Sequence, residues 1–405
     1  MTAFRRTVVA STIVLALGLT AGCSAAGGSA DDPVVLGASL PLTGPLQAFG
    51  TSLEVGYQLA VDEINEAGGI TVDGVARELA LEIQDNASTP ETASEQARDL
   101  VLESGAVALL GPATPPLSIP VSLAAEQLKV PAIMTITPIQ AWKGANPEGW
   151  KYAFDAFFDE VQMTDTQFQA ADLVETNKKV ALFTDLEEDG IVMGGLWADK
   201  AESFGYEIVA HEEFPVGNTN FSAQVSEAKA SGAEVVIAQV IPPDGIALLR
   251  EMKAQGYQPE VLFLEKAGNT GGYPQLSDGL ADGVLAANWY AEGMGLDREA
   301  DFIADFAEQT GGVNSDLGTI AYGYSIARIL IEAIESAGSL EADAIVAAIA
   351  ATDGEYPAGS IAFADDHTAA LPAVQTQWVG GDQVLVLNAG GDAASSIAVP
   401  VPGLQ

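Results

Sequence analysis

The apolar and polar positions of the chain alternate in blocks that predict strands and helices in turn. Short continuous apolar runs, such as Val34–Leu40 and Leu79–Ile83, are separated by stretches such as Ser52–Ala67, in which apolar residues recur three and four positions apart. Such spacing is typical of a helix with one buried face, and a continuous apolar run is typical of a strand buried on both faces. The pattern predicts parallel strands covered by helices on both sides.

A second set of alternating elements follows a stretch rich in Trp and Phe, at 142–158. The strands predicted there, with helices between them, are Val180–Thr184, Tyr206–His211, Val235–Val240, Val261–Leu264 and Gly283–Trp289. The last predicted elements are helices at about Ala300–Gln309, Ile320–Ser336 and Leu340–Ala350 and strands at Ser360–Phe363, Val374–Val379 and Val384–Leu387. Because these late elements must complete two sheets, we expect two lobes joined by a hinge, with a cleft between them.

Composition and charge exclude several classes of function and of binding site. Of 405 residues, 48% are hydrophobic and 18% are charged, which is typical of a globular chain. Lys and Arg number 16 against 56 Asp and Glu, so the chain would be repelled by nucleic-acid phosphates. One Cys and two His exclude a disulfide framework and a Cys or His metal cluster within one chain. We expect no metal, no cofactor and no enzymatic activity, since P-loop and Gly-x-Ser-x-Gly motifs are missing.

The N-terminus has the pattern of an export signal. Arg5 and Arg6 precede an uncharged apolar run, 7–22, which is too short for a comfortable membrane span and fits a signal-peptide core. The run ends in Leu19-Thr20-Ala21-Gly22-Cys23, which resembles a bacterial lipobox; the alternative is a buried free Cys23. We therefore expect a signal peptide at 1–22, a lipidated Cys23 with a flexible tether at 23–32, and an acidic body anchored by lipid at the outer face of the cell membrane.

An ordered set of motifs resembles type I periplasmic binding proteins, and most closely the branched-chain amino acid (Leu/Ile/Val) receptors of ABC transporters. The motifs include Pro41-Leu42-Thr43-Gly44-Pro45, Ala60-Val61-Asp62-Glu63-Ile64-Asn65, Asn218-Thr219-Asn220-Phe221-Ser222 and Gly279-Leu280-Ala281-Asp282-Gly283. They are collinear with the family between about 34 and 363. Each motif alone is weak, and their order makes the resemblance specific.

The resemblance implies an α/β fold of two Rossmann-like lobes with parallel sheets, joined by a three-strand hinge. It implies a first lobe at 33–154 and 290–352 and a second lobe at 155–289 and 353–405. It further implies a monomer that closes around a small ligand, such as a branched-chain amino acid or a related carboxylate or amide, and delivers it to a membrane permease. A ligand-sensing module for a membrane signalling partner is the alternative, and an extracytoplasmic hydrolase is a more distant one.

Ligands of open α/β sheets bind beyond the carboxyl ends of the strands, which singles out four loops. In the first loop, 111–116, the Thr114 hydroxyl and the Ala113 N–H could donate to a ligand carboxylate, and the resemblance implies that role. The alternative is that Thr114 only caps the helix that follows.

The second loop, after Val130-Pro131, offers Thr135, Thr137, Gln140 and Trp142. The resemblance implies a Thr here that binds the amino-acid head group, and either Thr135 or Thr137 fills that place. Trp142 would either stack on the ligand or pack at the hinge.

The third and fourth loops carry charge. Asp189 stands where the family commonly has a Tyr, and it would either meet a cationic amine or be solvated. An acid that pairs with the ligand ammonium is implied at Lys266, with Glu265 beside it; a lysine there would favour a carboxylate instead. Ile241 aligns with a covering aromatic of the family, and Phe49 is the expected apolar wall.

Overall fold

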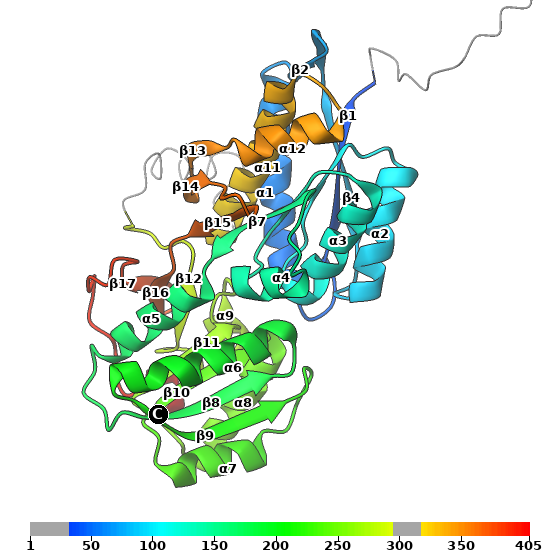
Figure 1. Ribbon diagram of the computed structural model, residues 1–405. Helices are drawn as coiled ribbons and strands as arrows, with labels where there is room; N and C mark the ends of the chain where they lie inside the picture. The colour runs from blue at the N-terminus through cyan, green and yellow to red at the C-terminus, as the bar shows by residue number, and fades with distance from the viewer. Residues whose placement is uncertain (1–31, 295–316) are drawn as a thin grey trace, which may run out of the picture.

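The computed structural model describes residues 32–294 and 317–405, which form two lobes stacked end to end (Figure 1). Each lobe is a sheet with helices on both faces. This mixed α/β architecture with parallel sheets confirms the predicted fold class. The predicted signal peptide, Cys23, tether residues 23–31 and the helix predicted at Ala300–Gln309 lie outside the described residues.

The sheet of the first lobe consists, within the described ranges, of six parallel strands. Their order is β15 (Thr368–Leu371), β7 (Ala153–Phe158), β6 (Ala132–Met134), β5 (Ala108–Leu110), β1 (Val34–Leu40) and β4 (Leu79–Asp85). The helices of this lobe are α1 (Gln47–Glu66), α2 (Pro90–Leu102), α3 (Pro115–Leu128), α4 (Ile139–Ala145), α11 (Leu317–Ala337) and α12 (Ala342–Ala350). Two hairpins complete it, β2 (Ile70–Val72) with β3 (Val75–Arg77) and β13 (Asp353–Tyr356) with β14 (Gly359–Ala362).

The sheet of the second lobe has seven strands in the part of the chain that is described. Their order is β17 (Asp382–Leu387), β16 (Val374–Val379), β12 (Leu285–Asn288), β11 (Val261–Lys266), β10 (Val235–Val240), β8 (Lys179–Asp185) and β9 (Glu207–Phe214). β16 is antiparallel to both of its neighbours, and the other pairings are parallel. Its helices are α5 (Glu160–Ala171), α6 (Glu188–Ala201), α7 (Ser222–Ser231), α8 (Pro242–Gln255) and α9 (Tyr273–Leu276).

Burial explains why the central strands read as continuous apolar runs. Every residue of β5, β6, β10 and β12 is buried, because helices cover both faces of these strands. The outermost strands β4 and β9 consist mostly of half-buried and exposed positions. The core of each lobe therefore lies between the sheet and its helices. The loops at the carboxyl ends of the parallel strands are left to form a site.

The chain crosses between the lobes after β7, after β12 and after β15. One predicted lobe boundary is wrong: β15 pairs with β7 in the first sheet, whereas we expected 353–405 in the second lobe. The β13–β14 hairpin also belongs to the first lobe, where Tyr356 donates to Glu332 of α11. The first late strand that pairs in the second sheet is β16, which lies beside β12. The crossing therefore falls between Leu371 and Val374. The first crossing also lies later than predicted, because β7 stays in the first sheet to Phe158.

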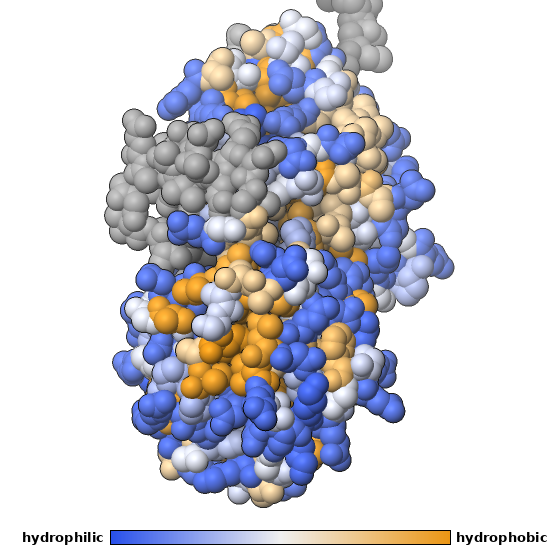
Figure 2. Space-filling model, turned by 90° about the vertical axis from the view of Figure 1, so that its left-hand side faces the viewer, coloured by the Kyte–Doolittle hydropathy of each residue, from blue (hydrophilic) through white to orange (hydrophobic). Residues whose placement is uncertain are grey.

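Polar side chains cover much of the face in Figure 2, and apolar side chains gather on its second lobe. Exposed apolar residues of that lobe include Leu173, Val384 and Val399. Among the described helices, none combines the length and the apolar character that crossing a membrane requires.

Candidate functional site

A cavity lies between the lobes, at the carboxyl ends of strands from both sheets. The residues predicted from the sequence that line it are Phe49, Thr114, Asp189, Glu265 and Lys266. The lining residues that were not predicted are Pro115, Ile136, Pro138, Phe157, Phe158, Met163, Met193, Gln239, Asn269 and Trp289. Both lobes contribute, so a bound molecule would contact both at once.

Several predicted residues support the cavity without lining it. The Thr135 hydroxyl donates to the Pro112 carbonyl at 2.8 Å, and the Thr137 hydroxyl donates to the Thr135 carbonyl at 2.9 Å. Ala113 and Ile241 are buried and also lie outside the lining. The hydroxyls of the two threonines thus donate to backbone carbonyls of the first-lobe loops.

Gln140 and Trp142 also lie outside the lining, because they belong to α4, which leads away from the cavity. Trp142 is fully buried, stacks on Trp150 with ring centroids 4.8 Å apart, and donates to Ser122 Oγ at 2.9 Å. Of the two roles considered for Trp142, packing is the one that the structure shows. Gln140 Nε2 donates to Asp159 Oδ2 at 2.5 Å, across the hinge.

Three residues that line the cavity have a left-handed backbone. Thr114, Ile136 and Lys266 line it with φ angles of 69°, 46° and 61°, which side chains other than glycine seldom adopt. Such strain persists only where the surrounding structure enforces it, and it is typical of ligand sites. Thr114 stands at the N-cap position of α3, yet its hydroxyl makes no capping bond and meets no partner among the described residues. That hydroxyl is therefore available to a ligand.

The first-lobe wall of the cavity is apolar. It consists of Phe49 from α1, Ile136 after β6, and the pair Phe157 and Phe158 that ends β7. Trp289 packs on Phe157 with ring centroids 5.0 Å apart and extends this wall. Aromatic side chains offer a large apolar contact area, so this wall suits the hydrocarbon part of a small molecule.

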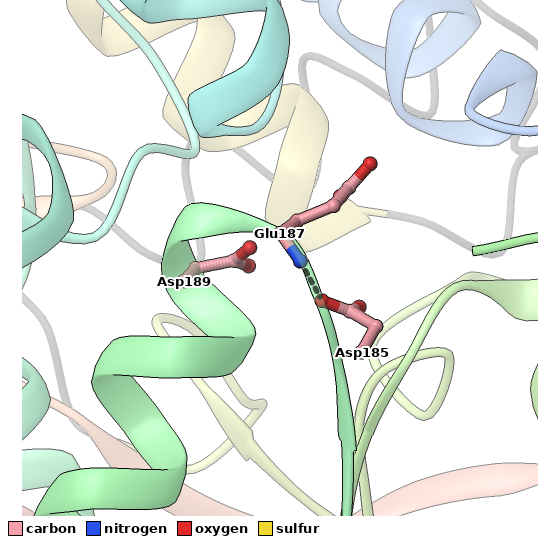
Figure 3. Close-up of side chains that lie close together, drawn as sticks. All are labelled: Asp185, Glu187 and Asp189. Carbon is pink, nitrogen blue, oxygen red and sulfur yellow. Dashed lines mark hydrogen bonds between the residues drawn. The ribbon is translucent and has the colours of Figure 1, made fainter. Parts of the chain in front are cut away.

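The second-lobe wall carries a buried charge cluster. Lys266 Nζ lies 3.1 Å from Asp185 Oδ2, 3.3 Å from Glu187 Oε2 and 3.0 Å from Asp189 Oδ2. Figure 3 shows these carboxylates at the end of β8 and the start of α6, where the Glu187 N–H donates to Asp185. Burial lowers the pKa of Lys266, but the three carboxylates outweigh it and raise the pKa above its ordinary value. Lys266 is therefore an ammonium.

The same three carboxylates are close enough together to ligate a metal ion, with ligand oxygens within 4.8 Å of one another. The Lys266 ammonium contacts all three and supplies the counter-charge that an ion would supply. The cluster is thus complete with protein groups alone.

Glu265 also lines the cavity, beside Lys266. Gln167 Nε2 donates to its carboxyl at 2.5 Å, and the Ala287 N–H donates at 3.2 Å. Burial raises the pKa of Glu265 to about 8, although these hydrogen bonds oppose the shift. Neighbouring strand residues normally point to opposite faces. Both of these side chains reach the cavity because the left-handed backbone of Lys266 breaks that alternation.

Among the lining residues that were not predicted, Gln239 has the clearest signal in the sequence. It is the single polar residue in the apolar strand Val235–Val240, and it stands at the carboxyl end of β10. Its Nε2 donates to Asp189 Oδ2 at 2.8 Å, which ties β10 to the start of α6. A polar residue near the end of a buried parallel strand is a signal that points to a site.

The comparisons with known proteins bear on this arrangement. Residues 33–383 match the family model described as periplasmic binding protein. The chain belongs to this family. A Leu/Ile/Val-binding protein homolog of Brucella melitensis is 29% identical over 258 residues, which are 63% of this chain and 67% of that protein. The predicted family resemblance is thereby confirmed, and the family is one of substrate-binding proteins.

Solved structures show the same fold. The substrate-binding protein LivJ of a branched-chain amino acid transporter from Streptococcus pneumoniae, in complex with isoleucine, has a TM-score of 0.75 at 23% identity. It covers 87% of this chain and 100% of that one. An ABC-transporter solute-binding protein of R. palustris, in complex with benzoate, has a TM-score of 0.74 at 18% identity, over 91% and 99% of the two chains.

Proposed function

We propose that this protein is the extracytoplasmic substrate-binding component of an ABC importer and captures a small organic solute, such as a branched-chain amino acid or a related carboxylate or amide, in the cavity between its lobes. The observation that carries the proposal is the cavity itself, which has an apolar wall on one lobe and a charged wall on the other. Relatives named for Leu/Ile/Val binding, and similar folds solved with isoleucine and benzoate, support this solute class.

The mechanism is closure about the hinge. A solute held between the walls contacts both lobes, so it binds the closed arrangement more tightly than an open one and shifts the population towards it. Closure also removes the apolar part of the solute from water, which favours binding by about 25 cal/mol per Å² of buried apolar surface. The closed form then docks on the membrane permease, and no covalent step takes place.

The export signal and the lipid anchor at Cys23 complete the proposal. A lipidated Cys23, followed by the small and polar residues 24–31, would tether the body near the outer face of the membrane. Palmitate or diacylglycerol labelling of the intact protein, lost in Cys23→Ser, tests this part separately.

Binding is tested on the monomeric body that starts at Ser24, by thermal shift and calorimetry. The panel contains Leu, Ile, Val and Phe, the matching carboxylic acids, the amides and the amines. A solute at a hundred times its Kd stabilises the protein by about 2.7 kcal/mol, which is a visible shift. If no member of the panel binds, the proposal fails.

A matched pair of variants locates the solute. Met193 and Met252 are both fully buried in the second lobe, but only Met193 lines the cavity. Each change to Ala costs about 2–5 kcal/mol of stability, and only Met193→Ala should weaken solute binding. Equal effects of both variants on Kd would place the solute elsewhere.

Deleting the gene should abolish high-affinity uptake of that solute, whereas a signalling receptor would leave uptake intact.

A further inference from the structure

Two unused hydrogen-bonding groups of the second-lobe wall are acceptor oxygens. The other unused polar atoms of cavity-lining side chains are the Thr114 hydroxyl and the indole N–H of Trp289, which is a neutral donor. Asp189 Oδ1 and Gln239 Oε1 belong to cavity-lining side chains that are only 1% and 3% exposed, and neither accepts a hydrogen bond from any described residue. A buried polar atom without a partner costs about 1–3 kcal/mol. Both oxygens therefore favour a hydrogen-bond donor from the cavity.

The roles of these oxygens are fixed by their neighbours. Gln239 Nε2 donates to Asp189 Oδ2 at 2.8 Å, and the ammonium of Lys266 lies 3.0 Å from the same oxygen. Turning the Gln239 amide around would set its oxygen against the carboxylate, so the assignment of Oε1 as the unused atom is secure. Asp189 Oδ1 is left unused because Oδ2 takes both donors.

The side-chain donors of this wall are already engaged. Lys266 Nζ contacts three carboxylates, and Asn269 Nδ2 donates to the Ala287 carbonyl. Glu265 receives the amide of Gln167. A ligand carboxylate would meet no uncommitted cationic donor among the described residues of this wall.

The start of α3, on the first lobe, also offers little to an anion. A helix N-terminus normally presents free N–H groups to a negative charge. Here the first two helical residues are Pro115 and Pro116, which have no N–H, and the Thr114 N–H donates to the Ile136 carbonyl at 3.0 Å. The group of Thr114 that is still without a partner among the described residues is its side-chain hydroxyl, which can donate or accept.

The net charge of the second-lobe wall is negative, which also favours a donor over an anion. The carboxylates of Asp185, Glu187 and Asp189 surround one ammonium, an excess of two negative charges even when Glu265 is protonated. Glu265 adds a second carboxyl group to the cavity lining, beside that of Asp189. A cationic group entering the cavity is attracted to this wall, and an anionic group is repelled.

We infer that the solute is held chiefly by a cationic amino group, which donates to Asp189 Oδ1 and Gln239 Oε1 while its apolar body lies against the aromatic first-lobe wall, and that a carboxylate is not required. The ligand class is thus primary alkyl- and arylalkylamines together with the amino acids that share their side chains. The inference rests on the proposed function and deepens it.

The first test compares three compounds for each apolar body. For the leucine body these are leucine, isopentylamine and isocaproate; for the phenylalanine body they are phenylalanine, phenethylamine and hydrocinnamate. Calorimetry on the native protein should show that the amine binds, whether or not the amino acid also binds, and that the acid of the same body binds at least about 100-fold more weakly, as expected for loss of a charged hydrogen-bonding group.

The second test uses three variants with the compound that binds. Asp189→Asn removes the charge, and Gln239→Met removes the acceptor at nearly constant volume; each should weaken amine binding by about 10- to 100-fold. Asp185→Asn is the matched control, because it removes one charge from the Lys266 cluster but no atom of the lining, and its effect on Kd should be at least about fivefold smaller. Urea denaturation of each unliganded variant confirms that it is folded.

The outcomes separate the inference from the proposed function. If an amino acid or an acid binds and the amine of the same body does not, the inference is overturned while the proposed function stands. The same holds if Asp189→Asn and Gln239→Met both bind the amine as the native protein does. If no compound of any series binds, the proposed function itself fails.

Discussion

The molecule buries carboxyl groups in two regions, and it stabilises them in two different ways. At the second-lobe wall of the cavity, the carboxylates that include Asp185 and Asp189 surround the ammonium of Lys266. At the hinge, Asp155 of β7 and Glu160 of α5 have no cationic partner among the described residues. Burial raises the pKa of Glu160 to about 8, and burial followed by the charge of Glu160 raises that of Asp155 well above its ordinary value. The Lys266 cluster uses a counter-charge, and the hinge pair uses protons.

This difference separates a fixed charge from a pH-dependent contact. The cavity cluster contains a permanent ammonium, so its charge pattern can serve recognition. At the hinge, Glu160 connects the lobes. It accepts from the Gln140 and Ala141 N–H groups of α4 at 2.6 and 3.0 Å, and Gln140 Oε1 accepts from the Glu160 N–H at 2.8 Å. Because α4 belongs to the first lobe and α5 to the second, protonation of Glu160 changes a contact that spans the hinge.

The substitution with the largest expected effect on stability is Lys266→Met. It leaves three carboxylates buried together without a counter-charge, and removal of one member of a buried ion cluster costs about 3–5 kcal/mol. Urea denaturation at neutral pH should show a loss of this size, and lowering the pH should restore part of it because the carboxylates can then be neutralised by protons.

Lys143→Met is the matched control for that change. Lys143 forms an ion pair with Asp366 in which both side chains are nearly half exposed. Exposed pairs contribute about 0–1 kcal/mol, so this variant should lose little stability. Equal losses in the two lysine variants would contradict the role given to the cavity cluster.

A second prediction concerns how stability depends on pH at the hinge. The folded protein holds the Glu160 proton up to about pH 8, whereas the unfolded chain releases it near its ordinary pKa of 4.5. Stability from this group is fully present below pH 4.5 and is lost as pH rises through about 8, at up to about 1.4 kcal/mol per pH unit. Glu160→Gln should remove the part of the slope that Glu160 contributes, measured by urea denaturation at several pH values.

Glu265→Gln provides the comparison for the hinge variant. Glu265 has a similarly raised pKa of about 8 but lies in the cavity, so its variant should flatten the same pH range and also alter solute binding. If the pH slope of Glu160→Gln equals that of the native protein, protonation does not stabilise the hinge contact.

Much of the fold could be predicted because buried parallel strands leave a strong signal. The strands predicted at Val34–Leu40, Val235–Val240 and Val374–Val379 have the observed bounds. β15, Thr368–Leu371, was missed because Thr-Ala-Ala-Leu is too short and too weakly β-forming to stand out, and its pairing with β7 alone defines it.

The site was predicted less completely, for reasons of local geometry. Sequence order placed Thr114, Asp189 and the pair Glu265 and Lys266 at strand ends, and all four line the cavity. It could not show that the left-handed backbone of Lys266 lets both neighbours face inward, because nothing in residue type announces that φ angle. Trp142 was also a candidate, but α4 turns it into the core.

The smallest predicted effects come from two glycines of α6, the helix that presents Asp189. A Cβ on Gly190 would lie 2.1 Å from the Asp185 carbonyl oxygen, whereas a Cβ on Gly195 would meet nothing within 4 Å. Gly190→Ala must push α6 away from β8, at a cost of about 1–3 kcal/mol, and should weaken amine binding because Asp189 moves. Gly195→Ala should instead stabilise the protein by about 0.5–1 kcal/mol, since Ala is the better helix former, and should leave binding unchanged. Opposite signs for these two substitutions in urea denaturation would show that close contact with β8, rather than helix propensity, positions the acidic wall, and equal signs would contradict it.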